Sequence, residues 1–234
     1  MNTHKIGLKQ IERQYLSASS LEMARLIISK TEIYQGKCLE LSSGAGYLGF
    51  ALAENTMMDI YLLENNRDAH KLAVTHIARN HAGGRIYAVR GSICEIPLPD
   101  ESMNMVTSKK SIFTWNNRKK IFEEVYRVLA PGGVACFCGG FEMRDLQFRV
   151  NSRLSNVNPK LTNLFDNQIY THKMNHFEKV LVQAGIPSYA INCNDNGVWV
   201  TFRKPSSEAA IRKPIKFTYL GPPKTMQYGE KAMI

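Results

Sequence analysis

The sequence has no run of about 18 apolar residues, the length that a helix needs to cross a bilayer. Its first residues, MNTHKIGLKQIERQYL, alternate charged and apolar side chains and so lack the apolar stretch of a signal peptide. Sixteen glycines and nine prolines are too few for a low-complexity or fibrous chain of 234 residues. We therefore expect a cytoplasmic globular protein with no membrane-spanning helix.

Cysteine is also scarce, and the five cysteines are an odd number. Four of them lie inside apolar runs that are typical of strands: Cys38, Cys136, Cys138 and Cys193. Two of these alternate onto one strand face, but no second Cys/His pair lies at the spacing of a zinc site. We expect buried, reduced thiols, no disulfide framework and no metal.

Acidic side chains are missing from residues 102–120, within a chain whose net charge is +10. The basic residues of this stretch are Lys109, Lys110, Arg118, Lys119 and Lys120. Such a stretch can contact nucleic acid, an anionic substrate or only solvent. Aromatic residues are not interleaved with the basic ones as in RNA-binding modules, so nucleic acid is a possible partner that the sequence does not favour.

Short apolar runs alternate with helix-period segments, which is typical of a layered α/β domain with a mainly parallel sheet. Strands are predicted at 37–41, 60–64, 86–90, 104–108, 133–139, 189–194 and 198–203. Helices are predicted at 21–30, 48–54, 67–80 and 118–129. A turn at Pro131-Gly132-Gly133 should end the last helix.

The chain divides into three parts. Residues 1–35 form a helical segment ahead of the first strand, in which Tyr15 is a candidate for a lid over the site. The main domain covers 36–204 and contains a polar, strand-poor cap insert at 141–172. Residues 205–234, which prolines interrupt, form an extended basic tail.

The segment from Cys38 to Gly49 predicts a strand, a glycine turn and a helix, an arrangement that presents free backbone N–H groups to a nucleotide-like ligand. Gly44, Gly46 and Gly49 complete the pattern G-x-G-x-x-G. Glu64 ends the next strand, where its carboxylate can accept hydrogen bonds from ribose hydroxyls. This spacing fits a dinucleotide as well as S-adenosylmethionine.

Glu40 discriminates between the two cofactors. A carboxylate beside the loop would repel a pyrophosphate, whereas it would attract the ammonium and sulfonium groups of S-adenosylmethionine. The alternative interpretation of Glu40 is a solvated charge at the end of a strand. The sequence therefore favours S-adenosylmethionine.

Four segments resemble the class I S-adenosylmethionine-dependent methyltransferases, especially their small-molecule branch: LELSSGAG (39–46), LLEN (62–65), GSICEIPLPDESMNMV (91–106) and FEEVYRVLAPGG (122–133). The resemblance extends from about Gly36 to Arg203. It implies a Rossmann-like, doubly wound α/β fold, with a seven-stranded sheet, helices on both faces and an antiparallel last strand.

The resemblance also implies a set of cofactor-binding residues. They are Glu40, Ser42, Gly44, Gly46, Glu64, Asn65, Ser92, Ile93 and Ser108. Three positions depart from the family pattern: Ser42 replaces the first loop glycine, Ser92 the acid that contacts the adenine amino group, and Asn104 an aspartate before the fourth strand. A side chain at position 42 would narrow the approach to the methionine end.

The acceptor should meet the sulfonium at the carboxyl ends of the middle strands. Candidate acceptor-binding residues are Lys109, Lys110, Phe113 and Trp115. The alternative is that the aromatics belong to the core beside a solvated basic loop. No N/D-P-P-Y-like motif follows the fourth strand, which disfavours methylation of DNA bases or protein amides.

No catalytic base can be named, because His172 and His176 are best explained as surface or capping residues. The predicted function is methyl transfer from S-adenosylmethionine, with S-adenosylhomocysteine as product, to a small anionic or aromatic acceptor by in-line displacement. The alternatives are a non-catalytic or altered-chemistry member of the fold and an RNA-directed methyltransferase. The oligomeric state stays open.

Overall fold

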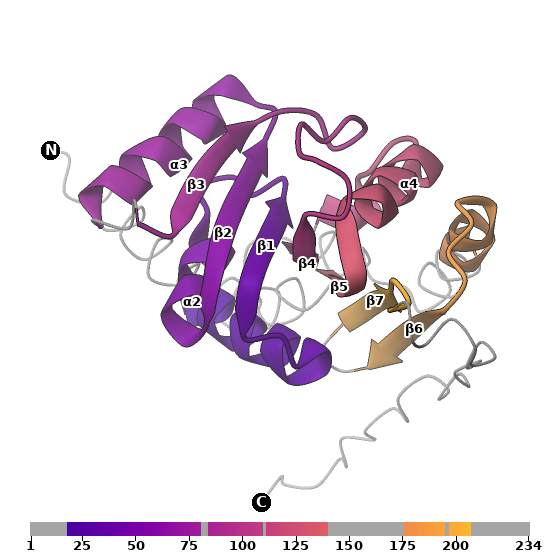
Figure 1. Ribbon diagram of the computed structural model, residues 1–234. Coiled ribbons are helices and arrows are strands. Elements are labelled where there is room, and N and C mark those ends of the chain that lie inside the picture. Colours follow the sequence, from indigo (N-terminus) through magenta and orange to yellow (C-terminus); the bar gives the residue numbers. More distant parts are fainter. Residues whose placement is uncertain (1–17, 81–83, 110, 140–175, 195–196, 207–234) are drawn as a thin grey trace, which may run out of the picture.

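The computed structural model describes residues 18–80, 84–109, 111–139, 176–194 and 197–206 (Figure 1). Its strands are β1 (Gln35–Leu41), β2 (Met57–Glu64), β3 (Ile86–Arg90), β4 (Met103–Lys109), β5 (Leu129–Gly139), β6 (Tyr189–Asn194) and β7 (Gly197–Arg203). They form one seven-stranded sheet in the order β3-β2-β1-β4-β5-β7-β6. β1 to β5 pair in parallel, whereas β7 is antiparallel to both of its neighbours, which confirms the predicted fold class.

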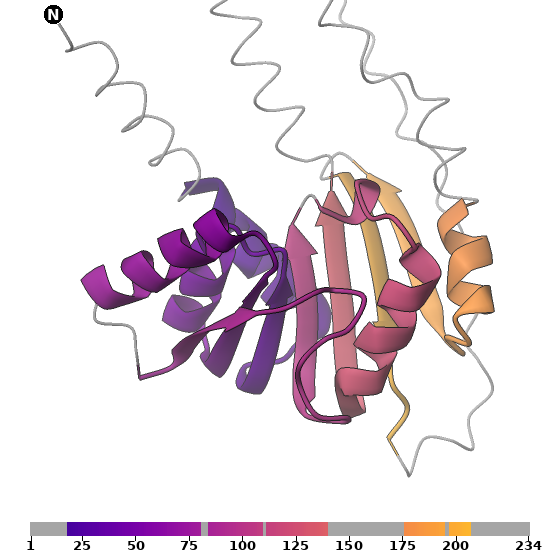
Figure 2. The ribbon, with the colours of Figure 1, turned by 90° about the horizontal axis from the view of Figure 1, so that it is seen from above.

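Helices cover both faces of the sheet, as predicted (Figure 2). The helix of residues 18–31, α2 (Tyr47–Asn55) and α3 (Arg67–Arg79) pack on one face. α4 (Arg118–Val128) and the helix of residues 176–183 pack on the other. Alternate residues of each strand feed the two cores: Cys38 packs with the first group of helices, and Leu39 packs with the second. The strand order reverses between β1 and β4, so a ligand is expected at the carboxyl ends of these strands.

The boundary between α4 and β5 differs from the prediction. The helix ends at Val128 and the strand begins at Leu129, so no separate turn lies between them. Pro131-Gly132-Gly133 lies within the strand, where the register against β4 shifts and Gly132 has a φ of 80°. The backbone N–H of Gly132 donates to the carbonyl of Lys204 at 2.8 Å, so the irregular stretch is held by the segment after β7. The glycines that predicted a turn therefore form a bulge within β5.

The three predicted domain parts are only partly described. Tyr15, His172, the cap insert at 141–172 and the tail from residue 207 lie outside the described residues, so the domain boundaries stay a prediction. His176 is the first described residue of the helix 176–183. None of the helices among the described residues has the length and apolar character needed to cross a membrane.

The thiols of β1 and β5 are buried, as predicted. Cys38, Cys136 and Cys138 are completely enclosed, and burial raises the pKa of the Cys136 thiol to about 12. These thiols are free, as is that of Cys94. In the described part of the chain, no three His, Cys, Asp or Glu residues group together as metal ligands.

Candidate functional site

The glycine loop connects β1 to α2, and its two glycines serve different purposes. Gly44 has a φ of 57°, and a Cβ at this position would meet nothing within 4 Å, so this side of the loop is open. Gly46 has a φ of 80°, and a Cβ there would lie 2.6 Å from the Leu62 side chain. Gly46 thus allows the turn to pack on β2, and Gly44 leaves the backbone accessible to a ligand.

Ser42 occupies a backbone conformation that explains the family's preference for glycine. Its φ is 53°, in the left-handed region, and its side chain is exposed. A residue with a Cβ is strained there. The departure at position 42 therefore lowers the stability of the loop, whatever its effect on a ligand.

We predict that Ser42→Gly raises the free energy of unfolding by about 1 kcal/mol, because it removes this strain. The greater freedom of glycine in the unfolded chain offsets part of the gain. Denaturant unfolding of both proteins measures the difference. Ser188→Gly is the matched control, because Ser188 lies outside the helices and strands and its φ is not positive. A Ser42→Gly variant no more stable than the Ser188→Gly variant would contradict the argument.

Glu64 joins the end of β2 to the glycine loop. Its Oε2 accepts a hydrogen bond from the backbone N–H of Gly44 at 3.0 Å, and its Oε1 accepts one from Asn66 at 2.8 Å. Asn66 in turn caps α3 by accepting from the N–H groups of Asp68 and Ala69. Each carboxylate oxygen has a second lone pair, which remains available for a ribose hydroxyl. Asn65, also predicted to bind cofactor, is exposed beside it.

Glu40 is buried, so its interpretation as a solvated strand-end charge is wrong. Its side chain is 4% exposed, and Oε2 accepts a hydrogen bond from the N–H of Gly49 in the first turn of α2 at 2.9 Å. Burial raises the pKa of Glu40 to about 8, with a further contribution from the charge of Glu64. The Gly49 hydrogen bond and the charge of Lys109 oppose this rise. A cation that reached Glu40 would stabilise its ionised form.

Lys109 ends β4 and is not part of a solvated loop. Its Nζ donates to the hydroxyl oxygens of Ser19 at 3.1 Å and Ser20 at 3.0 Å, which ties the helix of residues 18–31 to the sheet. Burial lowers the pKa of Lys109 to about 8, and the charges of Cys138 and Glu40 oppose this decrease. The neighbouring Lys110 lies outside the described residues.

Ser108 connects the carboxyl ends of the two central strands. Its hydroxyl is fully buried and donates to the carbonyl of Leu41 at 3.0 Å. It also forms a short contact with the hydroxyl of Ser111. Ser108 therefore holds β4 against the end of β1, directly before the glycine loop.

Trp115 belongs to the core, which is the alternative considered for it above. Its ring is 5% exposed and makes edge contacts with Phe122 and Phe137, at centroid distances of 5.9 and 5.1 Å. Its Nε1 donates to the hydroxyl of Ser111 at 2.9 Å. Phe113 lies in the short 3₁₀ helix η1 (Ser111–Phe113), and its side chain is not described. Contact of either aromatic residue with an acceptor stays a prediction.

The two residues predicted to contact the adenine, Ser92 and Ile93, follow β3. The Ser92 hydroxyl oxygen accepts a hydrogen bond from the N–H of Cys94 at 3.1 Å, and the N–H of Glu95 donates to the Ser92 carbonyl at 3.3 Å. Ile93 is partly buried against the core. Ser92 keeps a hydroxyl proton and a lone pair for another partner.

Asn104 has no place in this site. It lies at the beginning of β4, and its Oδ1 accepts a hydrogen bond from the N–H of Lys37 at 2.8 Å. Both residues lie near the amino ends of their strands, whereas the glycine loop follows the carboxyl end of β1, so Asn104 is far from the loop. The family departure at position 104 therefore affects strand pairing.

His76 is a residue of the site that the sequence did not indicate. Its Nδ1 donates to the carbonyl of Ala45, in the glycine loop, at 3.0 Å. The ring packs against Tyr47 and Phe50 of α2, with centroid distances of 5.2 and 4.3 Å. No sequence motif relates α3 to the loop in this way, so only the packing of α3 reveals it.

The basic stretch is partly neutralised by neighbours on α4. Lys119 pairs with Glu123 at 3.1 Å and Lys120 with Glu124 at 3.6 Å. The guanidinium of Arg118 lies 5.1 Å from the ring centre of Phe177. The carboxylates of Glu123 and Glu124 reduce the positive charge that the stretch could offer to a nucleic acid.

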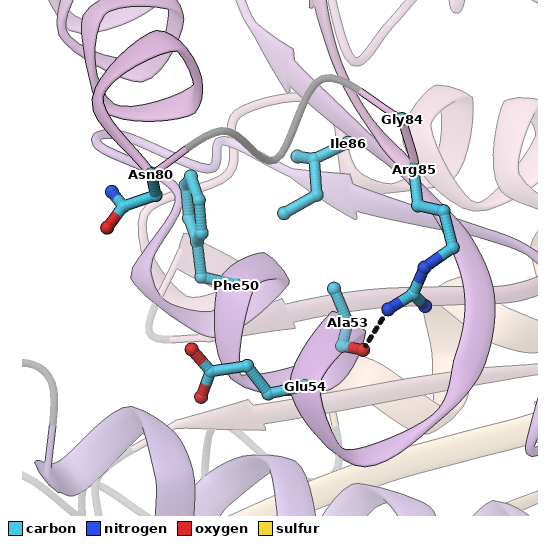
Figure 3. A pocket seen from close by; sticks show the side chains of 7 residues that line it. All are labelled: Phe50, Ala53, Glu54, Asn80, Gly84, Arg85 and Ile86. Carbon is cyan, nitrogen blue, oxygen red and sulfur yellow. Dashed lines mark hydrogen bonds between the residues drawn. The ribbon is translucent and has the colours of Figure 1, made fainter.

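A hollow of about 320 Å³ lies at the end of α2 that is away from the glycine loop (Figure 3). It is lined by Phe50, Ala53, Glu54, Asn80, Gly84, Arg85 and Ile86. The Arg85 guanidinium donates hydrogen bonds to the carbonyls of Ala53, Thr56 and Met58 at 2.9 to 3.3 Å. It thereby caps the carboxyl end of α2. None of the predicted site residues lines this hollow.

Comparison with known proteins relates the part of the chain that carries the glycine loop to a known family. The family of methyltransferase domains matches residues 39–137. The arsenite methyltransferase of Halobacterium salinarum is 31% identical over 97 residues, which are 41% of this chain and 25% of that protein. The uncharacterized methyltransferase YdaC of Bacillus subtilis is 25% identical over 170 residues, which are 72% of this chain and 86% of that protein. The chain thus spans about a quarter of the first relative and most of the second.

A crystal structure from Methanococcus maripaludis has the same fold. That protein, assigned to the S-adenosyl-L-methionine-dependent methyltransferases, has a TM-score of 0.74 and 29% identity, covering 87% of this chain and 94% of its own. The family match begins at Leu39 and ends at Phe137, so it contains the glycine loop, Glu64 and the loop after β3. These are the parts that the sheet brings to one edge. Residues 39–137 therefore match the family of methyltransferase domains, and the fold as a whole is that of an S-adenosylmethionine-dependent methyltransferase.

Proposed function

We propose that this chain is an enzyme that transfers a methyl group from S-adenosylmethionine to a small acceptor with an anionic or aromatic group. The observation that carries the proposal is the contact between Glu64 and the N–H of Gly44. It joins a carboxylate suited to a ribose with a loop that is open to a ligand. The cytoplasmic location expected from the sequence is part of the same proposal.

The residues present fit the cofactor. Ser43, inside the glycine loop, has a buried hydroxyl with no hydrogen-bond partner among the described residues, as expected where a polar ligand completes a site. Glu64 and Asn65 would hold the ribose, and Glu40 the ammonium end, directly or through water. Ser92 and Ile93 would contact the adenine. Bound there, the cofactor supplies an electrophilic methyl group on its sulfonium.

The chain's own contribution is positioning, because displacement at a sulfonium requires the nucleophile, methyl carbon and sulfur in line. Ser108 and the Ser111 hydroxyl hold the end of β4 beside the glycine loop, where the acceptor would enter. Lys109 holds the helix of residues 18–31 over the same edge. A thiolate or phenolate acceptor arrives already activated, so no base is assigned.

A small acceptor is supported by the partners of the basic stretch on α4 and by the name of one relative, the arsenite methyltransferase. Lys109 remains the residue proposed to bind an anionic group of the acceptor, since it lies at the carboxyl end of β4. Lys110, Phe113 and Trp115 complete the proposed acceptor side.

Ligand binding tests the proposal. S-adenosylhomocysteine at about 100 times its dissociation constant is expected to stabilise the protein by about 2.7 kcal/mol, whereas NAD should leave the melting temperature unchanged. The reason is that Glu40 favours an ammonium group over a pyrophosphate. Thermal unfolding and calorimetry with each ligand provide the measurement. Binding of NAD without S-adenosylhomocysteine would refute the proposal, and cofactor binding without turnover on any small molecule would favour a non-catalytic or RNA-directed role.

A further inference from the structure

The loop that follows β3 has no helix or strand of its own, yet it carries Ser92 and Ile93. It runs from the end of β3 to the beginning of β4 and passes beside α4 (Figure 2). Hydrogen bonds from Cys94 and Glu95 close a turn on Ser92. This turn leads directly into Ile96, so the backbone at Ile96 determines where the turn lies.

Two residues of α4 hold that backbone. The Oε2 of Glu124 accepts a hydrogen bond from the N–H of Ile96 at 2.8 Å. The guanidinium of Arg127 donates to the carbonyl of Ile96 at 2.8 Å, to that of Leu98 at 3.0 Å, and to Oδ1 of Asp100 at 2.6 Å. Ile96 therefore has both of its backbone polar groups bound to α4.

Glu124 and Arg127 also bind each other through two parallel contacts. Nη2 of Arg127 lies 2.8 Å from Oε2 of Glu124, and Nε lies 3.1 Å from Oε1. Glu124 is 7% exposed, and its hydrogen bond with Arg127 lowers its pKa. Because 30% of the Arg127 side chain is exposed, the ion pair adds little net stability, whereas its bidentate geometry defines position sharply.

We propose that Glu124 and Arg127 are positioning residues for the adenine end of the cofactor pocket. They act through the backbone of residues 96–100 on the turn at Ser92. The inference rests on the proposed function, because it takes Ser92 and Ile93 to be the adenine contacts. It adds that the affinity for the adenosine part of the ligand depends on an ion pair of α4, whose residues come 27 or more positions after the loop residues that they contact.

The test compares Arg127→Met, Arg127→Lys and Glu124→Gln with the wild type. Calorimetry measures binding of S-adenosylhomocysteine and adenosine at a temperature where every variant is folded. Arg127→Met is expected to weaken both by roughly tenfold, the equivalent of one lost hydrogen bond. Arg127→Lys and Glu124→Gln each keep part of the network and should lie between the wild type and Arg127→Met. In the absence of ligand, amide hydrogen exchange at Ile96 should accelerate in the same order.

Arg85→Met is the matched control. Arg85 also donates to three backbone carbonyls, but at the far end of α2, so its loss should destabilise the fold without weakening adenosine binding. Equal losses of affinity in Arg85→Met and Arg127→Met would overturn the inference, as would faster exchange at Ile96 with unchanged affinity. A wild-type protein that binds neither ligand would instead refute the proposed function. Should Arg127→Met fail to fold, Arg127→Lys and Glu124→Gln carry the same comparison.

Discussion

Replacement of Glu64 by alanine is expected to weaken binding of S-adenosylhomocysteine by about 2–3 kcal/mol, a factor of about 30 to 150. Two effects combine in this loss. The ribose hydroxyls lose a charged acceptor, and the N–H of Gly44 loses the hydrogen bond that places the glycine loop. Isothermal titration calorimetry measures the change.

Glu64→Gln separates charge from shape. The two oxygens of Glu64 both accept from backbone N–H groups, so the amide nitrogen of a glutamine would face a donor at Gly44 or Asn66. A loss close to that of alanine is therefore expected. Glu54→Ala is the control, since Glu54 is an exposed acid at the far end of α2. Unchanged affinity in Glu64→Ala would show that Glu64 serves only the glycine loop and the start of α3.

The part of the folding stability that depends on Glu40 and Lys109 should pass through a minimum near pH 8, because the buried Glu40 and the half-buried Lys109 both titrate there. Burial raises the pKa of Glu40 from 4.5 to about 8 and lowers the pKa of Lys109 from 10.5 to about 8. Between pH 4.5 and 8 the folded chain keeps a proton on Glu40 that the unfolded chain loses, so stability falls as pH rises. Between pH 8 and 10.5 the unfolded chain keeps a proton on Lys109 that the folded chain loses, so stability rises again.

Glu40→Gln isolates the first of these effects. The variant should match the wild type at low pH and become more stable relative to it by up to about 1.4 kcal/mol per pH unit toward pH 8. Denaturant unfolding across the pH range gives both curves, and their difference removes the contribution of every other group. Glu54→Gln, which alters an exposed acid, should show no such difference. A constant difference between Glu40→Gln and the wild type would mean that Glu40 is ionised in the folded protein at all these pH values.

Lys109→Met isolates the second effect, and it should remove the rise above pH 8. In the wild type Lys109 donates hydrogen bonds to Ser19 and Ser20. The variant lacks these bonds, so we also expect it to loosen the helix of residues 18–31. If the rise in stability above pH 8 also disappeared in Glu40→Gln, which keeps Lys109, the group responsible for that rise would be one other than Lys109.

The order of the elements and the location of the cofactor loop were predictable because both depend on local patterns. Apolar runs and helix-period segments gave β3 and β6 with the observed bounds, and α3 to within one residue. The loop between β1 and α2 followed from its glycines. At Pro131-Gly132-Gly133 the sequence allowed either a turn or a strand bulge, and the predicted turn was wrong. The bulge is held by Lys204, which is distant in the sequence.

The sequence by itself determined the sheet fold, the resemblance to methyltransferases and the identity of Glu40 and Glu64 as acids beside the glycine loop, because these depend on residue type and spacing. Only the tertiary structure decided how those groups behave. The burial of Glu40 and Lys109, the contact of His76 with Ala45, and the pairing of Glu124 with the backbone of Ile96 join segments up to 90 positions apart. Burial and hydrogen-bond partners set pKa values and position, and neither is encoded in the residues adjacent in sequence.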